Sequence, residues 1–132
     1  MEIIRIKTII ELVGRPKEHI DKTMQKVVEL LESNDKFSII EKKITETKEI
    51  KGLWSTFGEF EINFSSFDDI STFCFEFMPS SIEIISPEKL KIDSREIENF
   101  TNDVLAKLHQ YDMVVKQIIL QKNNSNFQKK EN

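Results

Sequence analysis

Residues 3–33 read IIRIKTIIELVGRPKEHIDKTMQKVVELLES. From Ile4 to Leu12 every second residue is Ile, Thr or Leu, and this period of two predicts a strand over Ile3–Val13 with one buried face. Gly14-Arg15-Pro16 breaks the strand, and the proline suits the first turn of a helix. Apolar residues at spacings of three and four then predict an amphipathic helix over Lys17–Ser33.

The remainder of residues 1–92 carries the signals of three more strands and one short helix. We predict strands at Phe37–Thr47, Leu53–Phe64 and Ser81–Ser86, and a helix between Ser66 and Pro79. The order strand, helix, strand, strand, helix, strand is typical of an α+β, ferredoxin-like βαββαβ domain, in which both helices cover one face of a four-stranded antiparallel sheet. Lys42 and Lys43 favour an edge position for the second strand.

Strand parity and helical spacing direct one set of apolar side chains to the covered face of this sheet. We expect this set to form the core, and its members are Phe60, Ile62, Phe64, Ile70, Phe73 and Phe77.

A long helix follows, and residues 93–122 are assigned to the same domain. Asp93 or Ser94 can cap its start, and we expect it to end near Lys122. Residues 123–132 are polar and lack periodicity, so they are predicted to be a disordered tail.

Composition narrows the classes of function. The 132 residues carry a net charge of −4 with lysines and carboxylates intermixed, which argues against a protein that binds duplex nucleic acid. No apolar run is long enough to span a membrane, and the first residues lack the apolar stretch of a secretory signal. With Cys74 as the single cysteine, we expect a cytoplasmic protein.

The residues that could support chemistry have simpler explanations. Cys74 shares a helical stripe with Phe73, so we expect a buried thiol, and its spacing from His19 and His109 does not resemble a zinc site. Glu59 and Glu61 are expected to pair with Arg5 and Lys7 on the neighbouring strand. We therefore expect no enzyme activity, no metal and no cofactor.

Gly14 and Arg15 are the candidate ligand-binding residues. They precede a helix N-terminus, whose free N–H groups and dipole attract anions. The alternative is a simple turn between strand and helix. Single-stranded RNA binding on the uncovered sheet face is a further hypothesis, although Leu53 and Ser55 stand where stacking aromatic residues would be expected.

Two stretches resemble known families. Val13-Gly14-Arg15-Pro16, followed by a helix and a strand, resembles the opening of ACT-type regulatory domains, and this implies amino-acid binding at the loop. Residues 64–111, with Pro79-Ser80-Ser81-Ile82-Glu83-Ile84-Ile85-Ser86-Pro87-Glu88-Lys89-Leu90, are similar to the C-terminal extension (WCX) of WYL-domain transcription regulators. This resemblance implies a regulatory or assembly module in a stand-alone prokaryotic protein.

The length of the last helix predicts association. Residues 94–122 would span about 43 Å as a helix, whereas a sheet of ordinary strands offers about 20 Å. We expect its distal half to lie on a second subunit or another protein, with an interface of Leu108, Tyr111, Val115 and Ile118. A bent helix that folds back on its own sheet is the alternative. The eleven-residue step from Ile97 to Leu108 favours a nearly straight helix over a long coiled coil.

The expected function is therefore a non-catalytic regulatory or interaction module that works as a homodimer or through a protein partner. A small-ligand sensor for an amino acid or nucleotide, using Gly14 and Arg15, is the alternative, and RNA binding ranks third.

Overall fold

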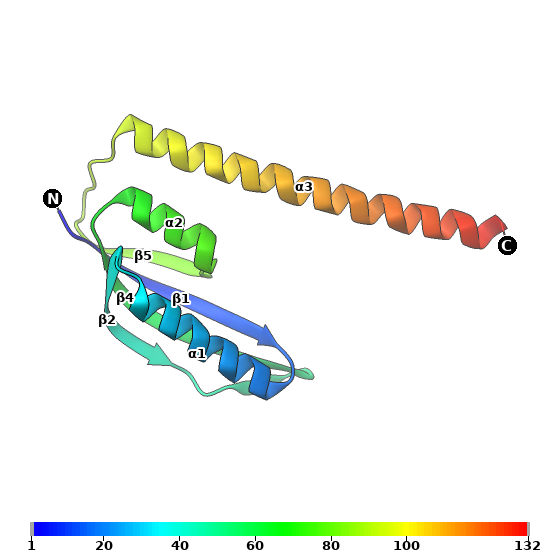
Figure 1. Cartoon of the computed structure of the whole chain (residues 1–132), viewed down its shortest axis with the longest axis horizontal. Coiled ribbons are helices and arrows are strands. Elements are labelled where there is room, and N and C mark those ends of the chain that lie inside the picture. Colours follow the sequence, from blue (N-terminus) through cyan, green and yellow to red (C-terminus); the bar gives the residue numbers. More distant parts are fainter. Residues whose placement is uncertain (1, 132) are drawn as a thin grey trace. The chain divides into compact units, whose positions relative to one another are not determined.

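The computed structural model describes residues 2–131. These residues form an α+β structure with three helices and one antiparallel sheet of five strands (Figure 1). The chain divides into two compact units, one that ends at Lys91 and one that begins at Ile92.

The first unit contains the whole sheet and two helices. Its elements are β1 (Ile4–Gly14), α1 (Lys17–Ser33), β2 (Phe37–Ile44), β3 (Lys48–Ile50), β4 (Leu53–Phe64), α2 (Phe67–Phe77) and β5 (Ser81–Ser86). The bounds of α1, β4 and β5 are those predicted from periodicity. The hydroxyl of Ser66 accepts a hydrogen bond from the Asp69 N–H at 3.1 Å, so it caps α2, the helix predicted between Ser66 and Pro79.

One strand was not predicted. The second strand ends at Ile44 instead of Thr47, and β3 follows as a separate short strand paired with β4. Lys51 and Gly52 join β3 to β4 with φ values of 52° and 82°. Two consecutive positive φ angles are typical of a tight hairpin turn, which usually has Asn, Asp or Gly at the position that lysine takes here.

The sheet order is β2-β4-β1-β5, with neighbours antiparallel. Ile6 lies opposite Ile62 of β4 on one side and Ile84 of β5 on the other. β2 lies at one edge, as its two lysines predicted.

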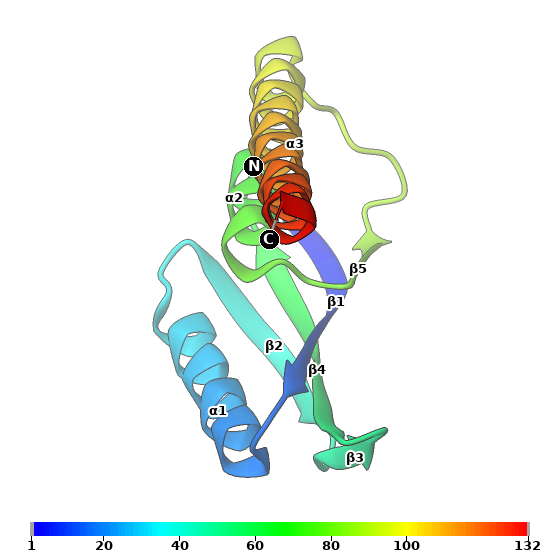
Figure 2. The same ribbon diagram turned by 90° about the vertical axis from the view of Figure 1, so that its right-hand side faces the viewer.

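The core lies on the sheet face covered by α1 and α2 (Figure 2). Of the predicted core residues, all but one are buried there, namely Phe60, Ile62, Phe64, Ile70 and Phe73. Phe77 is partly buried and packs against the same cluster. The ring of Phe73 makes edge contacts with Phe37 and Phe64 and stacks on Phe77, with centroid distances of 5.3–5.7 Å.

The second unit is dominated by α3 (Ser94–Glu131), a single helix of 38 residues, or about 57 Å. It begins at Ser94 as predicted but passes Lys122, so residues 123–131 of the expected disordered tail are helical; Asn132 lies outside the described residues. No glycine or proline occurs between 123 and 131 to end the helix. Within residues 2–131, no helix is sufficiently long and apolar to cross a membrane.

Candidate functional site

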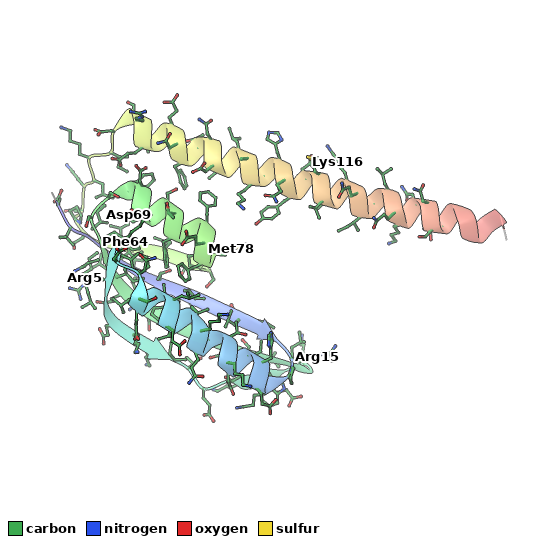
Figure 3. All side chains as sticks on the ribbon, viewed as in Figure 1. Arg5, Arg15, Phe64, Asp69, Met78 and Lys116 are labelled. Carbon is green, nitrogen blue, oxygen red and sulfur yellow. The ribbon has the colours of Figure 1, made fainter. Side chains whose placement is uncertain are left out.

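Gly14 is the last residue of β1, and Arg15 lies in the turn that leads to α1 (Figure 3). Arg15 is exposed. Pro16 stands at the N-cap position of α1 without a side-chain capping bond, and its carbonyl accepts from the N–H groups of His19 and Ile20. A side chain at position 14 would place its Cβ 3.1 Å from Cδ1 of Ile20. The close approach of Ile20 therefore favours glycine at this position without a ligand.

A groove runs beside α1, along the chain that leaves β2. Its volume is about 550 Å³, within the range of about 300–1,000 Å³ typical of ligand pockets. Apolar atoms of Met24, Val28 and Ile44 contribute to its lining. Charged side chains also line it, namely Lys17, Asp21, Lys22, Glu29, Lys42 and Glu46. Gly14 and Arg15 are not among its lining residues.

Hydrogen bonds at Asp21 join the two walls of this groove. One carboxylate oxygen of Asp21 accepts from Nζ of Lys17 at 2.8 Å, and the other accepts from the hydroxyl of Thr47. These two bonds lower the pKa of Asp21, and the bond to Asp21 raises the pKa of Lys17. The spacing of four between Lys17 and Asp21 could have suggested their pairing from sequence, whereas no local pattern identifies Thr47.

The uncovered face of the sheet carries paired charges. Arg5 forms an ion pair with Glu61, and Nζ of Lys7 lies 3.0 Å from a carboxylate oxygen of Glu59, which confirms the predicted cross-strand pairing. Hydrogen bonding to Glu59 raises the pKa of Lys7. These acidic groups are each matched by a cation, and their negative charge does not suit a phosphate backbone.

Cys74 is partly buried on α2 and packs against the core, and burial raises the pKa of its thiol. The residues in the described part of the chain include no cluster of three or more His, Cys, Asp or Glu side chains that could hold a metal ion.

The environment of Cys74 predicts slow modification. In native protein at neutral pH, we expect a thiol reagent to label Cys74 far more slowly than in denaturant, because little thiolate forms and the core restricts access. The measurement is the labelling rate with and without denaturant. Equal rates under both conditions would contradict this structural interpretation of the cysteine.

The predicted interface residues lie on one face of α3. Leu108, Tyr111, Val115 and Ile118 follow at spacings of three, four and three, and each is at least half exposed. Lys116 lies on the same helix (Figure 3), and its Nζ is 2.8 Å from a carboxylate oxygen of Asp112.

Comparison with known proteins gives one family. The model of the MJ0538 family matches residues 5–130. "Uncharacterized protein MJ0538" of Methanocaldococcus jannaschii is 36% identical over 106 residues, which cover 79% of this chain and 38% of that protein. This chain therefore matches well under half the length of that relative. No solved structure matches, and nothing found supports the resemblance to WYL-domain or ACT-type proteins.

Proposed function

We propose that this chain, which belongs to the MJ0538 family, is a non-catalytic interaction module with a regulatory or assembly role that self-associates through α3. The observation that carries the proposal is a group of large apolar side chains on α3 that are each 46–62% exposed. They are Leu105, Leu108, Tyr111, Met113, Val114, Val115, Ile118, Ile119 and Leu120. An exposed apolar surface of this extent marks a site of protein association.

Features of the first unit support a role without catalysis. We infer that this unit is ferredoxin-like, because the sheet order β2-β4-β1-β5 places the first strand between the third and fourth long strands. Glu59 and Glu61, two carboxylates of β4 that lie on the same sheet face, form ion pairs. Ion pairs of this kind are structural, since exposed cross-strand pairs stabilise a sheet by about 0.2–1 kcal/mol each.

The proposal is tested by size-exclusion chromatography with light scattering, at several micromolar concentrations of the protein. We expect a mass well above that of one chain, which falls on dilution as the complex dissociates. A constant mass of one chain over the whole range would contradict self-association.

The groove beside α1 favours a second candidate, a sensor of a small ligand such as an amino acid or nucleotide. It combines an apolar lining with the Lys17–Asp21–Thr47 network, as ligand sites combine apolar walls with a few polar groups.

Ligand binding in this groove predicts a shift in melting temperature. At a concentration one hundred times its dissociation constant, a ligand stabilises the folded chain by about 2.7 kcal/mol. We expect a stabilising amino acid or nucleotide to lose its effect in Asp21→Asn but to retain it in Asp35→Asn, an exposed acid outside the groove. Loss of the effect in Arg15→Ala alone would place the ligand at the loop, and no shift with any compound would contradict the sensor.

A further inference from the structure

We infer that α3 associates in parallel and in register with other copies of this chain, so that Lys107 of one copy lies beside Asp112 of the next. The inference rests on the proposed self-association. It adds the orientation, the register and the contacts that select a second copy as the partner.

The apolar face of α3 follows a seven-residue repeat once the register is counted from Leu108. With Leu108 at position a, the other a positions are Thr101 and Val115, and the d positions are Ile97, Val104, Tyr111 and Ile118. If Ile97 were taken as position a instead, Lys107 would fall at position d, inside the seam. Seven layers without a charged residue, over about 33 Å of helix, are typical of a left-handed coiled coil.

The flanking positions determine the orientation. In a parallel arrangement, position g of one helix lies beside position e of the next heptad on its neighbour, five residues further on. Lys107 at g then lies beside Asp112 at e, and Val114 at g lies beside Ile119 at e. Opposite charges meet, and apolar side chains meet each other.

An antiparallel arrangement lacks this match. There, position g faces g and position e faces e, and the alignment that stacks Leu108 on Tyr111 puts Lys107 beside Val114. Asp112 would lie beside Leu105 in the same alignment. Placing an ion against an apolar side chain removes water from the charge without a partner, which is unfavourable. The charges of α3 thus favour parallel copies.

The ion pair within the helix is compatible with this contact. Asp112 and Lys116 are 55% and 70% exposed, and Lys116 contacts Oδ2 of Asp112. Because a carboxylate accepts hydrogen bonds at both oxygens, Oδ1 remains suitable for Lys107 of the neighbouring copy.

The seam also favours more than two copies. Parallel dimers prefer leucine at d, whereas Ile97, Val104 and Ile118 put β-branched residues there, which shifts parallel coiled coils from dimers toward trimers and tetramers. Val114 and Ile119 widen the apolar face beyond a and d, and these positions become covered when three or four helices pack together.

Disulfide cross-linking of the full chain tests the orientation. In a Cys74→Ser background, Thr101→Cys places thiols at the same level of neighbouring parallel helices, within the Cα separation of about 4.4–6.8 Å that a disulfide needs. In the antiparallel alignment, residue 101 of one chain lies opposite residue 118 of the other. The two copies of residue 101 are then about 25 Å apart along the helix axis. We expect Thr101→Cys to form a cross-linked dimer, and Asn99→Cys, at the outward position f, to form much less.

The outcomes separate this inference from the proposed function. Thr101→Cys and Ile118→Cys chains can also be mixed. If the mixture yields mainly mixed disulfides while light scattering still shows an oligomer, the parallel orientation alone is overturned. A wild-type monomer would overturn self-association itself. If light scattering gives the mass of a dimer for the wild-type protein while Thr101→Cys still cross-links, the inferred number of copies is overturned.

Charge exchange tests the named contact. Lys107→Asp and Asp112→Lys each put like charges at the contact between residues 107 and 112 of neighbouring copies, and we expect each variant alone to associate about tenfold more weakly. An equimolar mixture restores opposite charges where the two variants alternate, and should recover most of the lost affinity. A mixture as weak as the separate variants would overturn the Lys107–Asp112 contact.

Discussion

Replacing Phe73 by alanine should lower the free energy of unfolding by about 3–5 kcal/mol, the cost usual for removing a buried phenylalanine. Phe73 is 1% exposed and its ring contacts Phe37, Phe64 and Phe77, so it joins β2, β4 and α2 in one aromatic cluster. Alanine would leave a cavity among these rings. This loss is a large part of the stability of a domain, which totals about 5–15 kcal/mol.

The measurement is the midpoint and slope of denaturant unfolding at one fixed protein concentration, because association would make stability depend on concentration. Phe57→Ala is the matched control, since Phe57 is 45% exposed on the uncovered sheet face. We expect the control to lose less than about 1 kcal/mol. Equal losses in the two variants would refute the packing of α2 on the sheet.

The second large effect is expected on α3. Tyr111→Lys combined with Val115→Lys puts two ammonium groups per chain into adjacent layers of the apolar seam. Each buried, unpaired charge disfavours association by several kcal/mol, so affinity should fall by more than about a hundredfold. Light scattering should then give the mass of one chain. The first unit should stay folded, because residues 2–91 hold the whole sheet and its core.

The control adds the same two charges elsewhere on the helix. Gln110 and Gln117 both occupy position c, outside the seam. The Gln110→Lys, Gln117→Lys double variant should therefore associate like the wild-type protein. Near-ultraviolet circular dichroism of Trp54, which lies on β4, reports whether the first unit keeps its structure. If both double variants remain associated, α3 is not the interface.

The fold was predictable where a segment carries its own pattern. The apolar spacing in Lys17–Ser33 predicted α1 to the residue, and Ser66 was correctly identified at the start of α2. Strand parity placed Phe60, Ile62 and Phe64 in the core. In each case the information lies within a few residues of chain, since a helix or strand presents one face at a fixed period.

The errors arose where the pattern was incomplete. β3 is three residues long, too short to show alternation, and its turn has lysine at a position that favours glycine or asparagine. The end of α3 was predicted too early because a polar segment without periodicity was interpreted as disordered. Polar residues can continue a helix when no proline or glycine interrupts its hydrogen bonds.

The candidate sites differ in the same way. The face formed by Leu108, Tyr111, Val115 and Ile118 was read directly from spacing on one helix. The groove beside α1 was missed, because Asp21 and Thr47 are 26 residues apart and meet only when the segment that follows β2 packs next to α1.

The sequence alone therefore determined the identity of the main elements, the faces they bury and the charge pairs between β1 and β4. These follow from local periodicity and from the alternation of side chains on paired strands. Only the tertiary structure explains why position 58 is occupied by glycine. A Cβ there would lie 2.6 Å from the ring of Phe60 and 2.9 Å from Ile44. The contact with Ile44, which lies on β2, depends like the groove on packing between separate segments, which no local spacing encodes.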